Sequence, residues 1–269
     1  ALAEALKPHK DSSGEWVFNN ALQYLDLGHS RIGTAGAEAL AEALKPREDG
    51  RGGWVYSGLQ HLDLAENRIG AVGMVALAEA LKPRENGHGG WVYSALQHLD
   101  LGANKNGDVV ALEMAKALKP REDGDGGWVY SALQYLDLSR NEIGTQGALA
   151  LAEALKLHEN DQGGWVFNKD LNSVILACNK IGAQGAMALA EALKPHKDSS
   201  GEWVFNNALQ YLDLGHSRIG TAGAEALAEA LKPREDGRGG WVYSGLQHLD
   251  LAENRIGAVG MVALAEALK

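Results

Sequence analysis

The sequence predicts a right-handed α/β solenoid in which every repeat contributes one parallel strand and one helix. Two observations lead to this fold class. Tryptophan recurs at positions 16, 54, 91, 128, 165, 203 and 241, in steps of 37 or 38 residues. The phrase Ala-Leu-Ala-Glu-Ala-Leu-Lys recurs at multiples of the same period, from Ala1 to Ala263. Repeats of this length cannot bury an apolar face alone, and they are typical of stacked arrays.

A leucine pattern predicts the strand of each repeat. Leu59, Leu62 and Leu64 follow Leu-x-x-Leu-x-Leu, whose second half alternates apolar and polar residues. Asn67 and a glycine-marked turn come next, and they end the strand. The structured part of each repeat therefore begins with a short strand whose leucines point into a core.

An apolar stripe predicts the helix that follows the turn. Ala37, Leu40, Ala41 and Leu44 have the i, i+3, i+4, i+7 spacing of one buried helix face. Pro46 ends that helix. Parallel strands lie ~4.8 Å apart, whereas packed helices need ~8–10 Å between axes. The stack must therefore curve into a horseshoe arc, with strands on the concave face and helices on the convex face.

An added segment separates each helix from the next strand, as at residues 46–56. Its glycine and aspartate content predicts a turn, and Trp54 and Tyr56 on either side of Val55 predict a short extended piece. We expect the tryptophans to stack as a ladder along one rim of the solenoid, where they anchor this inserted loop. A tryptophan row that captures carbohydrate or peptide is the alternative interpretation.

The repeats predict a single solenoid domain over residues 1–269. Its seven units are 1–38, 39–75, 76–112, 113–149, 150–187, 188–225 and 226–262, and a final helix spans 263–269. Residues 188–269 repeat residues 1–82 without a change, which fits a recent duplication, deliberate construction or a longer array. The chain starts without Met inside a helical phrase, so we expect a fragment of a longer chain. Neither end has a polar capping repeat, which predicts head-to-tail self-association.

Two slots of the repeat carry exceptions. Asparagine recurs after the strand and is expected to form a buried ladder of backbone contacts. Ser30 and Ser217 occupy this asparagine slot and make fewer bonds, which predicts weaker units. Asn106 replaces an isoleucine and disturbs the turn of the third unit, where Val110, in a glycine slot, is expected to refill the space.

The repeat resembles a known family. Its pattern, Leu-x-x-Leu-x-Leu-x-x-Asn-x-Ile-Gly-x-x-Gly-Ala-x-x-Leu-Ala-x-Ala-Leu, is similar to the ribonuclease-inhibitor-like type of leucine-rich repeat. The residues that match are Leu133, Leu136, Leu138, Asn141, Ile143, Gly144, Gly147, Leu151 and Leu155. The resemblance covers essentially the whole chain and implies the horseshoe fold. Family units are usually shorter, so the enlarged unit of 37 or 38 residues is a departure.

Composition bounds the partners and the compartment. The formal net charge is -10, from 35 acidic and 25 basic residues, which argues against a nucleic-acid partner. No apolar run approaches the ~18 residues of a membrane span, so no membrane partner is expected. One cysteine, Cys178, and the absence of Asn-x-Ser/Thr acceptors favour a cytoplasmic location.

Residues that flank the inward leucines are expected on the concave face and form the candidate partner-binding site. They are Tyr24, Asp26, His61, Asp63, His98, Asp100, Tyr135, Asp137, Arg140, Ser173, Ile175, Cys178, Tyr211, Asp213, His248 and Asp250. The aspartate column predicts an acidic surface for a basic protein partner, although Leu-Asp-Leu is also ordinary usage in this family. A neighbouring column of small residues, Gly28 to Ala252, is expected to leave room for that partner. The apolar break at Val174, Ile175 and Cys178, beside Tyr135 and Ser173, is the candidate hot spot, and simple drift within the repeat is the alternative interpretation.

No catalytic constellation, cofactor motif or metal centre is predicted. His61 and His98 beside two aspartates could accept a zinc-like ion, but side chains on parallel strands do not converge. The sequence therefore predicts a non-enzymatic protein–protein interaction scaffold. Three alternatives stay open: the ligand-sensing repeat region of a larger immune-type receptor, a GTPase-activating protein acting through an arginine such as Arg140, and a designed or structural array without a natural ligand.

Overall fold

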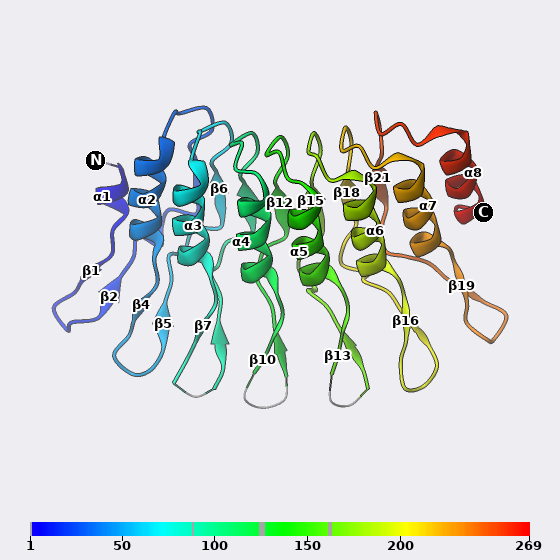
Figure 1. The fold of residues 1–269 in the computed structure, drawn as a ribbon. Helices are drawn as coiled ribbons and strands as arrows, with labels where there is room; N and C mark the ends of the chain where they lie inside the picture. Colours follow the sequence, from blue (N-terminus) through cyan, green and yellow to red (C-terminus); the bar gives the residue numbers. More distant parts are fainter. Residues whose placement is uncertain (1, 88, 124–126, 161–162) are drawn as a thin grey trace.

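The computed structural model describes residues 2–87, 89–123, 127–160 and 163–269. A seven-stranded parallel sheet forms one side of the molecule, and a row of helices covers the other side (Figure 1). The strands neighbour one another in chain order, which confirms the predicted α/β solenoid. They are β3 (Tyr24–Asp26), β6 (His61–Asp63), β9 (His98–Asp100), β12 (Tyr135–Asp137), β15 (Ser173–Ile175), β18 (Tyr211–Asp213) and β21 (His248–Asp250).

The helices run parallel to one another, and each begins at the edge where the strand-to-helix turns lie (Figure 1). They are α1 (Leu2–Leu6), α2 (Gly33–Leu44), α3 (Gly70–Leu81), α4 (Asp108–Leu118), α5 (Thr145–Leu155), α6 (Gly182–Leu193), α7 (Gly220–Leu231) and α8 (Gly257–Ala267). The four predicted stripe residues of α2 are all buried, and Ala43 joins them. The helix ends two residues before Pro46, as proline requires.

The inserted segments form two-stranded antiparallel hairpins along the opposite edge (Figure 1). Their strands are β1 (His9–Lys10) with β2 (Trp16–Val17), β4 (Arg47–Glu48) with β5 (Trp54–Val55), β7 (Arg84–Glu85) with β8 (Trp91–Val92), β10 (Arg121–Glu122) with β11 (Trp128–Val129), β13 (His158–Glu159) with β14 (Trp165–Val166), β16 (His196–Lys197) with β17 (Trp203–Val204), and β19 (Arg234–Glu235) with β20 (Trp241–Val242). The expected turn and extended piece are confirmed.

The tryptophan ladder differs from the expectation of stacked indoles. Within the described ranges no two indoles stack on each other, because a basic or imidazole side chain of the next hairpin lies between them. Arg121 lies over the ring of Trp91 at 4.4 Å, and His196 lies 4.2 Å from Trp165 between ring centroids. The indole N–H of Trp165 also donates to a main-chain oxygen of the next hairpin at 2.8 Å. Each tryptophan from Trp16 to Trp203 thus joins its own hairpin to the following one.

Leucine and asparagine columns hold successive units together between sheet and helices. Leu62 pairs in register with Leu99, and both are buried. The side-chain oxygen of Asn67 accepts bonds from the backbone of Ser30 and Ile32, at 3.1 Å each, while its amide donates to an oxygen of the preceding unit. The buried asparagine ladder predicted from the sequence is confirmed.

The third unit departs from its neighbours where the sequence predicts a disturbance. Asn106 is buried, and its side-chain oxygen and nitrogen make no hydrogen bond in the described structure. Val110 is fully buried in the same unit. Helix α4 begins at Asp108, whose carboxylate accepts bonds from Gly144 and Gly147 of the next unit.

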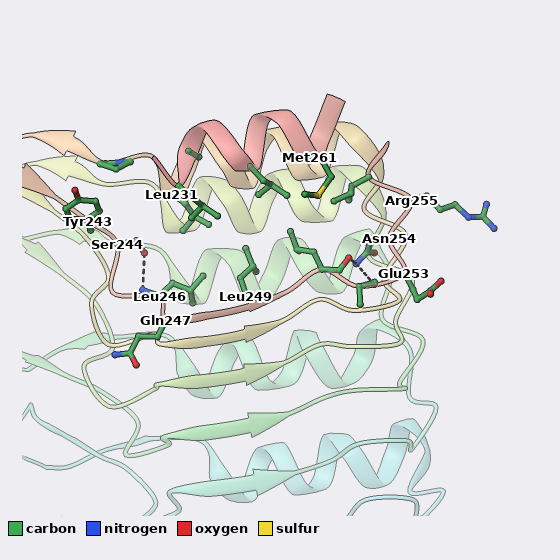
Figure 2. Close-up of a pocket in the computed structure, with 17 residues that line it drawn as sticks. Leu231, Tyr243, Ser244, Leu246, Gln247, Leu249, Glu253, Asn254, Arg255 and Met261 are labelled. Atoms are coloured by element: carbon green, nitrogen blue, oxygen red, sulfur yellow. Dashed lines mark hydrogen bonds between the residues drawn. The ribbon is translucent and has the colours of Figure 1, made fainter. Parts of the chain in front are cut away.

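The C-terminal end of the stack is an open apolar hollow of about 960 Å³ between β21 and α8 (Figure 2). Leu246, Leu249 and Met261 line it, together with Tyr243, which is 60% exposed. Leu62, the identical-copy counterpart of Leu249, is fully buried because another unit covers it. None of the described helices is long and apolar enough to cross a lipid bilayer.

Candidate partner-binding face

A column of aromatic and imidazole rings follows the exposed face of the sheet. Register places Tyr24, His61, His98 and Tyr135 on successive strands. Their rings stack in turn, with centroid separations of 4.1, 5.4 and 5.8 Å. Beyond Ser173 the column resumes with Tyr211 and His248, at 5.6 Å. The predicted column of rings is therefore present as a stack along this face of the sheet, with one interruption at Ser173.

A column of aspartates runs beside the rings, and each aspartate is the last residue of its strand. It comprises Asp26, Asp63, Asp100, Asp137, Asp213 and Asp250. In all six, Oδ1 accepts the backbone N–H of the residue two positions later, at 2.7–2.9 Å. The aspartate thus forms the turn that ends each strand, as short carboxylate side chains commonly do. This contact fixes the carboxylates on the sheet face.

The expectation that the small-residue column leaves room for a partner is wrong. The aspartate carboxylates themselves occupy that space. A Cβ added to Gly28 would lie 3.3 Å from Oδ1 of both Asp26 and Asp63, and one added to Gly102 would lie 3.1 Å from Oδ1 of Asp100. The residues are small because the carboxylates fold back over them, so a partner would meet the carboxylates first.

Burial and crowding change the acidity of this face. Burial raises the pKa of Asp100 to about 6, against the lowering effect of the Gly102 N–H, and repulsion from Asp137 adds to the rise. Burial likewise raises the pKa of Asp213. Burial lowers the pKa of His61, and the neighbouring His98 lowers it further. The His61 imidazole is therefore a poor counter-charge near neutral pH, and an external cation would relieve repulsion among the carboxylates.

Strand β15 interrupts both columns. Ser173 lies between Tyr135 and Tyr211, and its hydroxyl donates to Asn172 at 2.8 Å, so no ring fills this position. Ile175 stands between Asp137 and Asp213 as a partly exposed apolar residue in an acidic row.

Two predicted site residues lie past the strand ends. Arg140 and Cys178 are exposed, have left-handed backbone conformations with φ of 53° and 57°, and occupy neighbouring strand-to-helix turns. The structure therefore brings the ring and aspartate columns together, and it places these two residues at the edge of that face.

The side chains of His61, His98 and the neighbouring aspartates are not predicted to form a metal site. No set of three or more His, Cys, Asp and Glu side chains converges as a metal site within residues 2–87, 89–123, 127–160 and 163–269.

One surface feature escaped the sequence reasoning. The residue after each asparagine slot is exposed and mostly basic, as at Arg31, Arg68 and Lys105. The recurrence of a basic residue in Asn-x-Ile is the signal that could have revealed this row.

Comparison with known proteins supports the repeat family. A family model described as Leucine Rich repeat matches residues 18–41, 59–78, 132–152, 167–190, 205–228 and 246–265. No curated protein matches the chain. Each matched segment contains one strand of the seven-stranded sheet and most of the helix that follows it, and the segments occur in the same order as the strands in the sheet. The chain is therefore a leucine-rich repeat protein.

Proposed function

We propose that this protein is a non-enzymatic interaction scaffold that binds a basic protein segment on the exposed face of its sheet. The aspartate column is the observation that carries the proposal. Neighbouring strands place one carboxylate roughly every 4.8 Å along the stack. Because the turn bond at Oδ1 already orients each carboxylate, a cationic partner need not order it.

The ring column supports the same use of this face. The stacked rings from Tyr24 to Tyr135 present a continuous apolar edge beside the carboxylates. Arginine and lysine have apolar stems as well as charged ends, so they could contact rings and carboxylates together. A long basic segment that crosses the strands would meet both columns on each strand except β15.

The interruption at β15 is the proposed anchor point. Ser173 leaves a gap of one ring between Tyr135 and Tyr211. Two strand spacings separate these tyrosines by ~9.6 Å, which suits one planar group stacked between two rings. Asp137 and Asp213 lie on either side of Ile175 next to this gap, so a guanidinium is the planar group that fits the local charge.

The proposed repeat subtype, the unit boundaries and the compartment rest on the sequence. The glycine and alanine pattern of the helices supports the ribonuclease-inhibitor-like subtype with an enlarged unit, divided at the seven boundaries given above. The single exposed cysteine, Cys178, supports a cytoplasmic location, since it has no partner for a disulfide within the chain.

A charge-neutralised variant tests the proposal. Asp63→Asn/Asp100→Asn/Asp137→Asn removes three charges but keeps a side-chain oxygen for each turn bond. The probe is a fluorescein-labelled peptide of six Arg-Gly repeats at low ionic strength. We expect roughly tenfold or greater loss of affinity, because several exposed charge contacts act together.

The matched control removes three charges from hairpin loops. Asp49→Asn/Asp198→Asn/Asp236→Asn should change affinity by less than about twofold, since these carboxylates bond only to their own loops. Circular dichroism checks that both variants fold. Equal losses in the two variants would show that net charge alone attracts the peptide, and the sheet face would then have no special role.

A further inference from the structure

The strand-to-helix turns form an exposed basic row along one edge of this acidic protein. We call this row the arginine rim. Its members follow the asparagine slot of each unit: Arg31, Arg68, Lys105, Glu142, Lys180, Arg218 and Arg255. Six of these seven residues are basic, and all are exposed. The turns lie along the upper edge in Figure 1, opposite the hairpins.

The rim arginines differ from the other arginines in their contacts. Six of the chain's eleven arginines belong to the hairpins, and each forms an ion pair or lies over a tryptophan ring. The other five lie on the strand-to-helix turns: Arg31, Arg68, Arg140, Arg218 and Arg255. Across the described ranges none of these five makes an ion pair or a side-chain hydrogen bond, and neither does Lys105. Only Lys180 is paired there, with Glu142 at 2.7 Å.

The backbone holds these charges close together. On either side of Arg31, His29 N–H donates to Ala65 at 2.9 Å and Gly33 N–H donates to Asn67 at 3.0 Å. The turns are therefore bonded across units like the strands, with a spacing of ~5 Å. Like charges at this spacing repel one another, and an anion lying along the row would remove that repulsion.

Helix orientation adds positive potential to the same edge. Helices α2, α3, α7 and α8 each begin two residues after a rim arginine, and no side chain caps their first turns. All these helices run in one direction, so their positive ends meet at the rim. The positive ends of these helices and the guanidinium groups thus face the same strip of surface.

The narrow width of the rim favours a single extended chain as the anionic partner. The rim is one residue wide in each unit, and the aspartate column runs along the sheet beside it. Acidic side chains also occur in the same turns, as at Glu66, which pairs with His29 at 3.1 Å. A double helix would bring its second phosphate strand near these carboxylates. A single extended polypeptide is narrow enough to stay on the rim.

We propose that the arginine rim binds an acidic polypeptide segment, extended along the edge and crossing the turns. Alternate side chains of an extended segment lie ~7 Å apart, which flexible arginines ~5 Å apart can follow. Carboxylates match the planar fork of a guanidinium and can accept two bonds from it. This surface is separate from the aspartate face, so the inference does not depend on the function proposed above.

The test uses a fluorescein-labelled peptide of eight Glu-Gly repeats at low ionic strength. Arg31→Gln/Arg68→Gln/Arg218→Gln/Arg255→Gln removes four rim charges, and we expect at least about tenfold weaker binding. The control, Arg51→Gln/Lys169→Gln/Arg238→Gln/Lys269→Gln, removes four charges elsewhere and should weaken binding less than about threefold. Asp63→Asn/Asp100→Asn/Asp137→Asn should leave binding of this peptide equal or tighter, which separates the rim from the sheet face.

A measurement on the unaltered protein keeps the test independent of variant folding. In nuclear magnetic resonance spectra, the peptide should shift the Nε–H signals of the five turn arginines and leave those of the six hairpin arginines in place. Equal shifts in both groups, equal losses in the two quadruple variants, or no saturable binding would overturn the proposal. Tighter binding of a thymidine oligonucleotide with the same number of charges would also overturn it, in favour of a nucleic-acid site.

Discussion

The imidazole of His196 lies against the indole of Trp165, with ring centroids 4.2 Å apart, although the two residues belong to successive hairpins. The same relationship recurs with arginine in place of histidine, as where Arg84 lies 5.6 Å from the ring of Trp54. The hairpins are therefore bonded to one another as regularly as the strands of the sheet. The inserted segments extend the interface between units, and they should add to the stability of the array.

Loss of an interior tryptophan should destabilise the array. Trp54→Ala removes the contact with Arg84 and the 2.8 Å bond from the indole N–H to Glu85, and it should lower the free energy of unfolding by about 1–3 kcal/mol. Urea denaturation measures this change. Trp241 is the identical-copy counterpart, is 59% exposed and has no following hairpin, so Trp241→Ala should cost less than about 0.5 kcal/mol. Equal costs would show that the stacking contributes little.

Replacement of the buried amide of the third unit should stabilise the protein. Asn106→Ile removes a buried amide whose side-chain atoms make no hydrogen bond and restores the apolar residue of the other units. We expect unfolding to require about 1–3 kcal/mol more. Thermal and urea denaturation measure the gain. Asn67→Ile is the opposite control, because Asn67 makes several bonds and its loss should destabilise; a gain in both variants would contradict this explanation.

The serine in the asparagine slot of the sixth unit should be improvable. Asn254 accepts bonds from the backbone of Ser217 and Ile219, whereas the hydroxyl of Ser217 only donates, to Leu176 and Gly215. Ser217→Asn would supply an acceptor to the preceding unit, and we expect a gain of about 1 kcal/mol. Hydrogen exchange at Asn179 and Ile181 would report the new bonds. Ser30→Asn has no preceding unit in this chain to bond, so it should give no comparable gain.

The stability of the sheet face should depend on pH through Asp100. Its folded pKa of about 6 lies above the ordinary value of 3.8, so the folded state favours the protonated carboxyl. The stability that the protonated Asp100 carboxyl contributes to the folded state is complete below the ordinary pKa, and it is lost as the pH rises through 6. Asp100→Asn should therefore stabilise by about 1 kcal/mol at pH 7, after allowance for solvent screening, and by less at pH 4.5. A carboxyl-carbon titration of Asp100 with a midpoint below 4.5 would contradict this.

The open end should make the 269-residue chain associate head to tail. The hydroxyl of Tyr56 donates to Lys82 of the next unit at 2.9 Å, whereas Tyr243, its copy, is 60% exposed beside the apolar hollow (Figure 2). The first unit of a second copy could cover that hollow. Sedimentation equilibrium should show concentration-dependent mass, and Tyr243→Glu should reduce it. Val72→Glu, on an exposed helix position, should not; a constant monomer mass would refute the prediction.

The repeat period made the fold accessible from the sequence, because strand and helix patterns recur in every unit. The positions of Leu62 and Leu40 in the core could be predicted for the same reason. The pairing of each hairpin could not, since a strand of two residues, such as Arg47–Glu48, is too short to show alternation. The placement of that arginine over Trp16 depends on the distance between units, which no local pattern contains.

The candidate site was predicted in position but not in detail. The aspartate column lies on the sheet face as expected, whereas the turn bond from Asp63 Oδ1 to the backbone of Ala65 is a matter of side-chain rotamer. Because of that bond, the carboxylates cover the small residues beside them, and these residues do not leave room for a partner. The basic row at Arg31 and Arg68 was missed because each arginine alone resembles any surface residue. The row stands out only when these arginines are compared with the hairpin arginines, which form ion pairs or lie over tryptophan rings.

The hydrogen bonds of the asparagine ladder and the contacts of the tryptophans join each unit only to its immediate neighbours in the array. A pulling force on the two termini would therefore pass through the units in series, and every junction would carry the same load. The array should separate at its weakest junction rather than lose contacts between all units at once. We expect that junction at the third unit, where the side chain of Asn106 makes no hydrogen bond in the described structure, so a stretched molecule should part there into two intact blocks.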